Sequence, residues 1–130
     1  IFHRVPLDLD DKHKQFFLGK SLPGACPIGP CIVSKNEIKN PHNLNITCKV
    51  NNVLKQDSNT KYQLFDIADQ IETISKSTYL SPGDIIATGT PSGVGFARNP
   101  PEFLKNGDIV ECEVEKIGKI INRVVDYSYQ

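Results

Sequence analysis

The chain has 130 residues, a length that fits a single domain. Its 15 lysines and arginines balance its 15 aspartates and glutamates, so no net charge favours nucleic acid or an anionic membrane as a partner. No apolar run approaches the roughly 20 residues that a membrane-spanning helix needs.

The predicted elements begin with irregular chain. Residues 1–15 are charged and weakly periodic, which indicates a loop or a frayed helix. The stretch PGACPIGPCIV, residues 23–33, is interrupted by proline and glycine too often for a helix. We expect a short strand, CIVS, at residues 31–34 where this stretch ends.

A hairpin is predicted over residues 43–59. Apolar residues alternate with polar ones, the period of a strand with one solvated face, at Leu44, Ile46, Cys48 and Val50. The pair Asn51-Asn52 follows, and asparagine tolerates the positive φ of a tight turn. The stretch after this turn is therefore expected to return as the second strand of a β-hairpin.

One helix is predicted near residues 66–77, where the apolar period changes. Isoleucine recurs at i, i+4 and i+7 along one face, at Ile67, Ile71 and Ile74. Asp66 is placed to cap the N-terminus, and Pro82-Gly83 closes the segment. The apolar run DIIATG, residues 84–89, then predicts a central strand, because apolar side chains fall on both of its faces.

A second hairpin is predicted near the C-terminus, with no helix in residues 108–125. Val110, Cys112 and Val114 alternate with glutamates that we interpret as a solvated face: Glu111, Glu113 and Glu115. The turn at residues 117–119 leads to the returning strand KIINRVV. The whole is an α+β domain over residues 1–130, mostly β with one main helix.

The cysteines and one lysine are the first candidates for chemistry. Cys26, Cys31, Cys48 and Cys112 have no CxxC or zinc spacing, and we interpret them as free thiols of an intracellular protein. Lys20 follows a glycine in an apolar context. Its ammonium could stabilise an oxyanion or enolate if it points into a cleft, and a solvated lysine is the alternative.

The stretch TGTPSG, residues 88–93, contains more turn-forming residues than one turn needs. This excess indicates backbone packed close to another strand or to a ligand. The stretch lacks the lysine and the glycine spacing of a phosphate-binding loop. From spacing alone it is as well explained by a structural turn as by an anion-binding nest.

Three longer stretches resemble the fumarylacetoacetate hydrolase family in their order and spacing. Within that family, the resemblance is to the branch called fumarylacetoacetate hydrolase domain-containing type 2. They are LGKSLPGACPIGPCIVSKNEI, NLNITCKVNNVLKQDSNT and LSPGDIIATGTPSGVGFARNPPEFLKNGDIVECEVEKIGKIINRVV. The resemblance extends over residues 14–125, and its most specific part is the pattern PGD-x-I-x-TGTP-x-GVG.

This resemblance implies a mixed β-roll, a homodimer, and Mg²⁺ or Ca²⁺ as the cofactor. Members cleave or isomerise 2,4-dioxo acids and related 1,3-dicarbonyls by C–C cleavage, decarboxylation or keto-enol tautomerisation, as of oxaloacetate. Lys20 falls on the active-site lysine of the family, Thr90 falls on a substrate-binding threonine, and Gly89 allows the backbone to approach the substrate. The location implied is cytoplasmic or mitochondrial, with neither nucleic acid nor membrane as a partner.

The metal-binding carboxylates of the family have no counterpart in this sequence. The stretch Asp-x-Ser-Ala-Arg-Asp-x-Gln would fall on IFHRVPLD, which differs, and the Glu-x-Glu ligands would precede Ile1. We therefore expect the chain to be the C-terminal part of a catalytic domain, with no metal ligand of its own. The alternative is a catalytically inactive member that only folds and dimerises.

Overall fold

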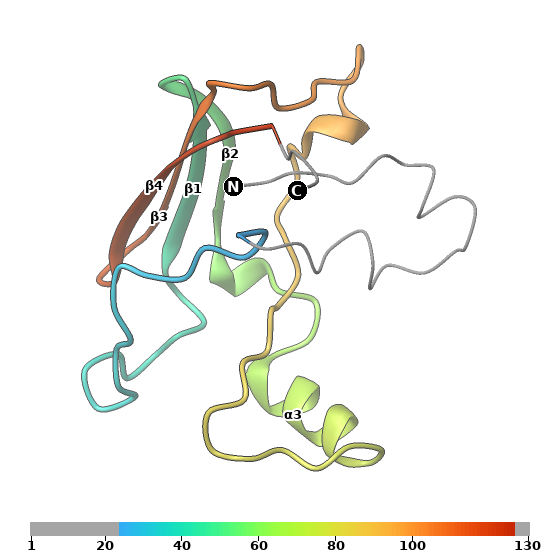
Figure 1. Ribbon diagram of the computed structural model, residues 1–130. Coiled ribbons are helices and arrows are strands. Elements are labelled where there is room, and N and C mark those ends of the chain that lie inside the picture. Colours follow the sequence, from blue (N-terminus) through green and yellow to red (C-terminus); the bar gives the residue numbers. More distant parts are fainter. Residues whose placement is uncertain (1–23, 127–130) are drawn as a thin grey trace.

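The computed structural model describes residues 24–126 and shows a four-stranded sheet with a separate helix (Figure 1). The strands are β1 (Asn45–Val50), β2 (Val53–Asn59), β3 (Ile109–Val114) and β4 (Gly118–Arg123). The helix is α3 (Ile67–Ser75), and two short 3₁₀ turns, η1 (Thr60–Tyr62) and η2 (Gly95–Ala97), complete the elements. The described chain is thus mostly β with one main helix, as predicted.

The sheet has the order β2-β1-β3-β4, and every pairing is antiparallel. It consists of two hairpins joined through β1 and β3, which are far apart in sequence. Cross-strand partners lie on the same face, so one row of side chains crosses all four strands, formed by Gln56, Cys48, Cys112 and Ile120. Because β2 and β4 are the edges, each keeps one side of its backbone outside the ladder.

Both predicted hairpins are confirmed. The first turns at Asn51 and Asn52, which have φ of 50° and 65°, as a two-residue turn requires. The Asn51 amide also donates to Asp108 at 2.9 Å, and its oxygen accepts from the Ile109 N–H at 2.9 Å. This turn is therefore tied to the start of β3. The second hairpin exists, but its turn lies at residues 115–117, two residues before the predicted position, with positive φ at Lys116 and at Gly118, where β4 begins.

Glu111 in β3 and Glu115 in the turn after it take part in structural contacts. Glu111 lies between two lysines, 3.5 Å from Lys49 Nζ and 3.2 Å from Lys119 Nζ. The hydrogen bond from Lys119 and the charges of both lysines lower the pKa of Glu111. Glu115 accepts from the Asn45 N–H at 3.0 Å. Glu113 is exposed, as expected for a solvated face, whereas Glu111 and Glu115 are half-buried in these contacts.

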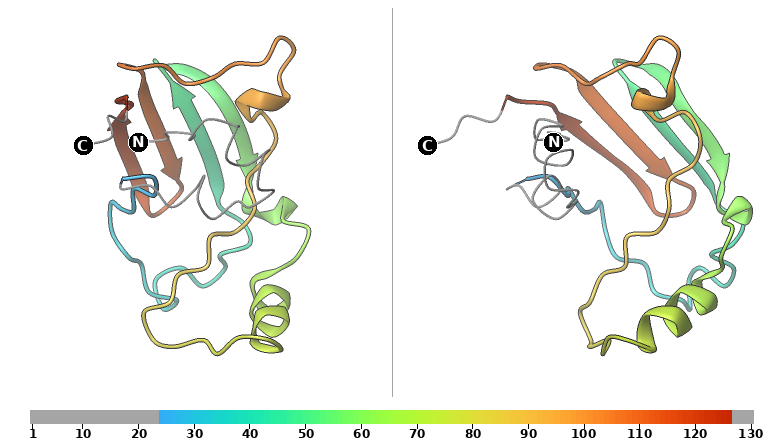
Figure 2. Two further views of the ribbon diagram at one scale, coloured as in Figure 1. Left: turned by 45° about the vertical axis from the view of Figure 1, so that its right-hand side comes forward. Right: turned by 90° about the vertical axis from the view of Figure 1, so that its right-hand side faces the viewer.

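The predicted helix is confirmed, including its cap. Asp66 accepts from the Asp69 N–H at 2.8 Å, and the Asp69 carboxylate accepts from the Asp66 N–H at 3.3 Å, which is a capping box. In both figures α3 lies beyond one end of the strands and covers neither face of the sheet (Figures 1 and 2). The cap is local, so α3 starts at Ile67 without help from the sheet.

Two predicted strands are wrong. Residues 31–34 and 84–89 are both irregular. Apolar content is not enough for a strand, because the backbone groups also need a partner strand. The described residues offer neither segment a partner, and the side chains of Ile32 and Ile85 are 94% and 71% exposed. Ile86 instead turns toward α3.

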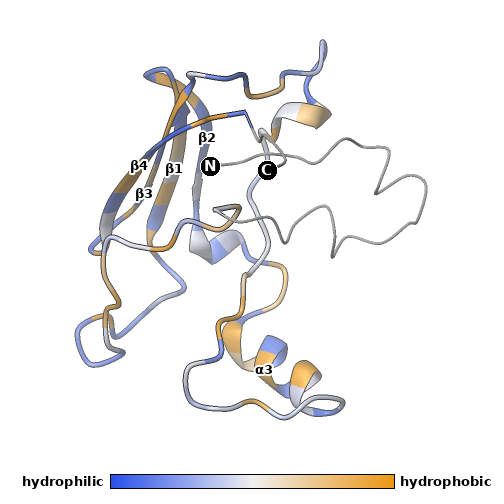
Figure 3. Cartoon of the chain, in the orientation of Figure 1, coloured by the Kyte–Doolittle hydropathy of each residue, from blue (hydrophilic) through white to orange (hydrophobic). Residues whose placement is uncertain are grey.

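The buried core is small and belongs to the sheet and its flanks. Leu44, Val110 and Val124 are the buried apolar residues of the described chain. Apolar residues also gather on α3 and the segment next to it, where they remain exposed (Figure 3). Within the described residues, no helix has the length and apolar character to cross a membrane.

Candidate functional site

The candidate site is the TGTPSG loop, and Gln56 on edge strand β2 holds it. The Gln56 Nε2 donates to Thr90 Oγ1 at 3.0 Å and to the carbonyl oxygen of Pro91 at 2.7 Å. One half-buried side chain thus fixes the position of a threonine that is 34 residues further along the chain. Because the strand is part of a sheet, the loop is attached to a rigid element.

Backbone packing fixes the other end of this loop. Gly93 has φ of 100°, and a Cβ there would collide with the carbonyl oxygen of Lys55. Arg98 bonds to the same place, because its Nη2 donates to the Lys55 carbonyl at 2.6 Å and its Nε donates to the Gly93 carbonyl at 3.0 Å. Only glycine allows this close approach of loop and strand.

An ion pair also connects this end of the loop to β2. Lys55 Nζ lies 2.7 Å from the Glu102 carboxylate, and Arg98 Nε lies 3.7 Å from it. The hydrogen bond from Lys55 is the main cause that lowers the pKa of Glu102. A Cβ at Gly95 would also collide with the Glu102 backbone. Residues 93–102 therefore form a compact corner against β2.

Gly89 and Thr90 differ from this corner because they face open space. A Cβ at Gly89 would meet nothing within 4 Å, and both residues are exposed. A hydroxyl has one donor and two acceptor positions, and Gln56 occupies one acceptor position of Thr90. The described residues provide no acceptor for the Thr90 proton, which leaves it available to an oxygen of a ligand.

The excess of turn residues thus has two causes along one loop. Gly93 is needed for packing against a strand, whereas Gly89 and Thr90 are presented to solvent. Lys20 lies outside the described residues, so its position relative to Thr90 stays a prediction. Residues 24–126 contain no group of three histidine, cysteine, aspartate or glutamate side chains that fits a metal ion.

Sequence reasoning missed the two side chains that hold the loop, Gln56 and Arg98. Gln56 stands in the stretch VNNVLKQDSNT, which carried the family resemblance, but no role was expected for it. The sequence did not place it beside Cys48, because a regular hairpin with the Asn51-Asn52 turn pairs Cys48 with Lys55, and the bulge between Cys48 and Lys49 shifts the pairing to Gln56. Arg98 gave no signal, because its contacts depend on how the chain folds back to β2.

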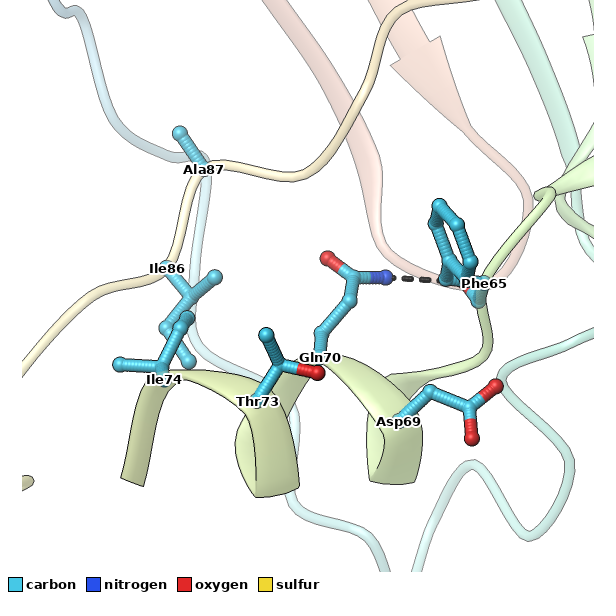
Figure 4. A pocket seen from close by; sticks show the side chains of 7 residues that line it. All are labelled: Phe65, Asp69, Gln70, Thr73, Ile74, Ile86 and Ala87. Carbon is cyan, nitrogen blue, oxygen red and sulfur yellow. Dashed lines mark hydrogen bonds between the residues drawn. The ribbon is translucent and has the colours of Figure 1, made fainter. Parts of the chain in front are cut away.

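A shallow groove lies elsewhere, between α3 and the segment before the loop. Phe65, Ile74 and Ile86 supply its apolar surface, and the Gln70 amide donates to the Phe65 carbonyl at 3.0 Å along one side (Figure 4). Asp69, Thr73 and Ala87 complete the lining. The groove contains no cluster of ionisable groups and is not a catalytic candidate.

Comparison with known proteins places these features in a family. The family model described as fumarylacetoacetate (FAA) hydrolase C-terminal matches residues 5–125. The rat (Rattus norvegicus) protein named oxaloacetate tautomerase Fahd2a, mitochondrial, is 52% identical over 112 residues, covering 86% of this chain and 36% of the relative. The chain thus spans about a third of the length of that relative.

Solved structures agree with this relationship. Fumarylacetoacetate hydrolase from Exiguobacterium antarcticum superposes with a TM-score of 0.87 at 41% identity, covering 92% of this chain and 43% of the other. Maleylpyruvate hydrolase from Sphingobium sp. SYK-6, in complex with manganese(II) ion and pyruvate, gives 0.74 at 36% identity, covering 83% and 38%. With the extent of the family match and the identity to its members, this chain belongs to the fumarylacetoacetate hydrolase family.

Proposed function

We propose that this chain forms the C-terminal part of an enzyme that acts on 2,4-dioxo acids or related 1,3-dicarbonyls. The reaction is hydrolytic C–C cleavage, decarboxylation or keto-enol tautomerisation, and oxaloacetate is the first substrate to test. The observation that carries the proposal is the Thr90 hydroxyl, held by Gln56 and open to solvent beside Gly89. The names of the similar proteins support this substrate class.

The role proposed for this loop is substrate binding. A dioxo acid carries a carboxylate and two carbonyl oxygens, all of which are hydrogen-bond acceptors. Thr90 Oγ1 accepts from Gln56, so its proton is free to be donated to such an oxygen. The open space next to Gly89 lets the substrate reach the backbone. Lys20 is proposed to stabilise the enolate that forms as the C–C bond or C–H bond is broken.

A divalent cation, Mg²⁺ or Ca²⁺, is part of this proposal through the family resemblance and the manganese in one related structure. The described residues do not form a cluster that fits it. A homodimer and a cytoplasmic or mitochondrial location are likewise proposals, the latter supported by the name of the rat relative.

Steady-state kinetics of the native-length protein with oxaloacetate and an acylpyruvate test the proposal. Thr90→Val keeps the side-chain shape but removes the hydroxyl, and should weaken substrate binding by about 1–3 kcal/mol. Thr88→Val, two residues away in the same exposed loop, is the matched control and should change binding little. Lys20→Ala should lower turnover by roughly 100-fold or more and affect binding less.

The alternative function is a folding and dimerisation module without catalysis. The native-length protein would then form dimers in sedimentation experiments but show no turnover with either substrate and no substrate-dependent change in stability. Equal effects of Thr90→Val and Thr88→Val on substrate binding would contradict the role given to Thr90.

A further inference from the structure

Cys48 and Cys112 are directly opposite one another on neighbouring strands β1 and β3. Their Sγ atoms are 3.7 Å apart, although 64 residues separate them in sequence. Neither is bonded to a further cysteine, and both are half-buried. Within residues 24–126, this is the one close contact between two thiols.

The position of the pair in the ladder suits a covalent bond between the two sulfurs. The N–H of Glu115 donates to Asn45 O, and the N–H of Asn51 donates to Ile109 O, each at 2.9 Å. Hydrogen-bonded and non-hydrogen-bonded pairs alternate along an antiparallel ladder, which makes Cys48–Cys112 a non-hydrogen-bonded pair. Such pairs have Cα atoms about 4.5 Å apart, within the range of about 4.4–6.8 Å that a disulfide accepts.

The two thiols also differ in reactivity. When both thiols are protonated, the Cys112 Sγ donates to the Cys48 Sγ. Once Cys112 is ionised, the Cys48 thiol donates to the thiolate instead, and this interaction lowers the pKa of Cys112. The same interaction, together with burial, raises the pKa of Cys48. A thiolate is the nucleophilic form of cysteine, so Cys112 is the group that an oxidant would meet first, with Cys48 next to it as the partner.

We propose that Cys48 and Cys112 form a redox-sensitive dithiol, which a peroxide oxidises to a cross-strand disulfide between β1 and β3. The Cys112 thiolate attacks one peroxide oxygen, the O–O bond breaks, and Cys112 becomes a sulfenic acid. Cys48 then loses its proton and attacks the Cys112 sulfur, which forms the S–S bond and releases water. Two thiols lose two electrons, and one hydrogen peroxide is reduced to two waters.

The position of Cys48 and Cys112 relates the proposed disulfide to the TGTPSG loop, residues 88–93. Gln56, Cys48, Cys112 and Ile120 share one row across the sheet, so the disulfide would lie next to the strand residue that holds Thr90. Half-burial admits a small peroxide more readily than a bulky disulfide reagent. The proposal does not depend on the proposed enzyme activity.

The test is mass spectrometry of the native-length protein after mild hydrogen peroxide and blocking of remaining thiols. A peptide pair linked through Cys48 and Cys112, lost on treatment with dithiothreitol, is the expected result. The double variant Cys26→Ser/Cys31→Ser should keep this link, because it removes the two exposed cysteines. Cys48→Ala should lose it and leave a sulfenic acid on Cys112 that reacts with dimedone.

Three results would overturn the proposal. One is full labelling of both Cys48 and Cys112 by the blocking reagent after peroxide. Another is a disulfide that joins either of them to Cys26 or Cys31 instead. The third is the loss of the link in the Cys26→Ser/Cys31→Ser variant. Because the decisive measurements use the wild-type protein and a variant changed at exposed residues, they do not depend on the folding of Cys48→Ala.

Discussion

The sheet and the helical region of this chain differ in how they are held. The four strands are joined by a continuous ladder between distant parts of the sequence, and the buried residues Leu44, Val110 and Val124 accompany them. The helix α3 is capped within its own first turn, yet Ile71 on its apolar stripe is 43% exposed. The sheet thus carries the tertiary stability of the described chain, while α3 relies on local bonds.

The candidate site lies where these two regions meet. The chain leaves α3, passes the groove beside it, and first reaches β2 at Thr90 and Pro91, where Gln56 binds it. The exposed part of the loop therefore depends on a few polar contacts, whereas the corner at Gly93 depends on close packing. The following substitutions separate these contributions.

The largest expected effect comes from the core of the sheet. Leu44→Ala should lower the free energy of unfolding by about 3 kcal/mol, because a buried leucine side chain leaves a cavity. Ile71→Ala, on the exposed helix stripe, should cost less than about 1 kcal/mol. Urea unfolding followed by circular dichroism measures both. Equal losses would show that the helix stripe is buried as deeply as the sheet core, against the comparison above.

The second effect tests the corner of the loop. Gly93→Ala should destabilise the chain by about 2 kcal/mol, because a side chain at positive φ is strained and its Cβ meets the Lys55 carbonyl. Gly89→Ala meets open space and should leave the unfolding midpoint almost unchanged. In the proposed enzyme, Gly89→Ala should instead weaken substrate binding. A stability loss of the same size at both glycines would contradict the division of the loop.

The sheet could be predicted from the sequence better than the site. The hairpins follow from alternating residues and from Asn51-Asn52, and α3 follows from the isoleucine period and Asp66, all of which are local signals. The strand expected at residues 84–89 failed because its formation depends on a partner, which local pattern does not report. Thr90 and Gly89 came from the family resemblance, whereas Gln56 and Arg98 are defined by contacts across 34 and 43 residues.

The third effect concerns the link between strand and loop. Gln56→Leu removes donors to Thr90 and Pro91 while keeping a similar volume, and should cost about 1 kcal/mol in stability. Its main result should be a more mobile loop, seen as lower NMR order parameters for the backbone of residues 88–93. Gln70→Leu removes a comparable bond to the Phe65 carbonyl within the helical region and is the matched control. If both variants leave the order parameters of this loop unchanged, Gln56 does not hold it.

The smallest expected effect is a pH dependence of stability at the joint between the hairpins, where the Asn51 turn contacts Asp108 at the start of β3. The Lys105 N–H donates to Asp108 at 2.8 Å and the Asn51 amide donates at 2.9 Å, and these bonds lower the pKa of Asp108. A carboxyl with a lowered folded-state pKa stabilises the fold above its unfolded pKa of about 3.9, and this stabilisation is lost as the pH falls through the folded value. Asp108→Asn should therefore be less stable than the wild type at pH 7, and the difference in urea midpoint between the two chains should narrow below about pH 4. Both proteins retain every other carboxylate. The loss of stability that those carboxylates cause in acid is therefore shared and cancels in the difference. A difference that stays constant from pH 7 to pH 3 would mean that the charge of Asp108 contributes nothing to the joint, and that only its shape matters there.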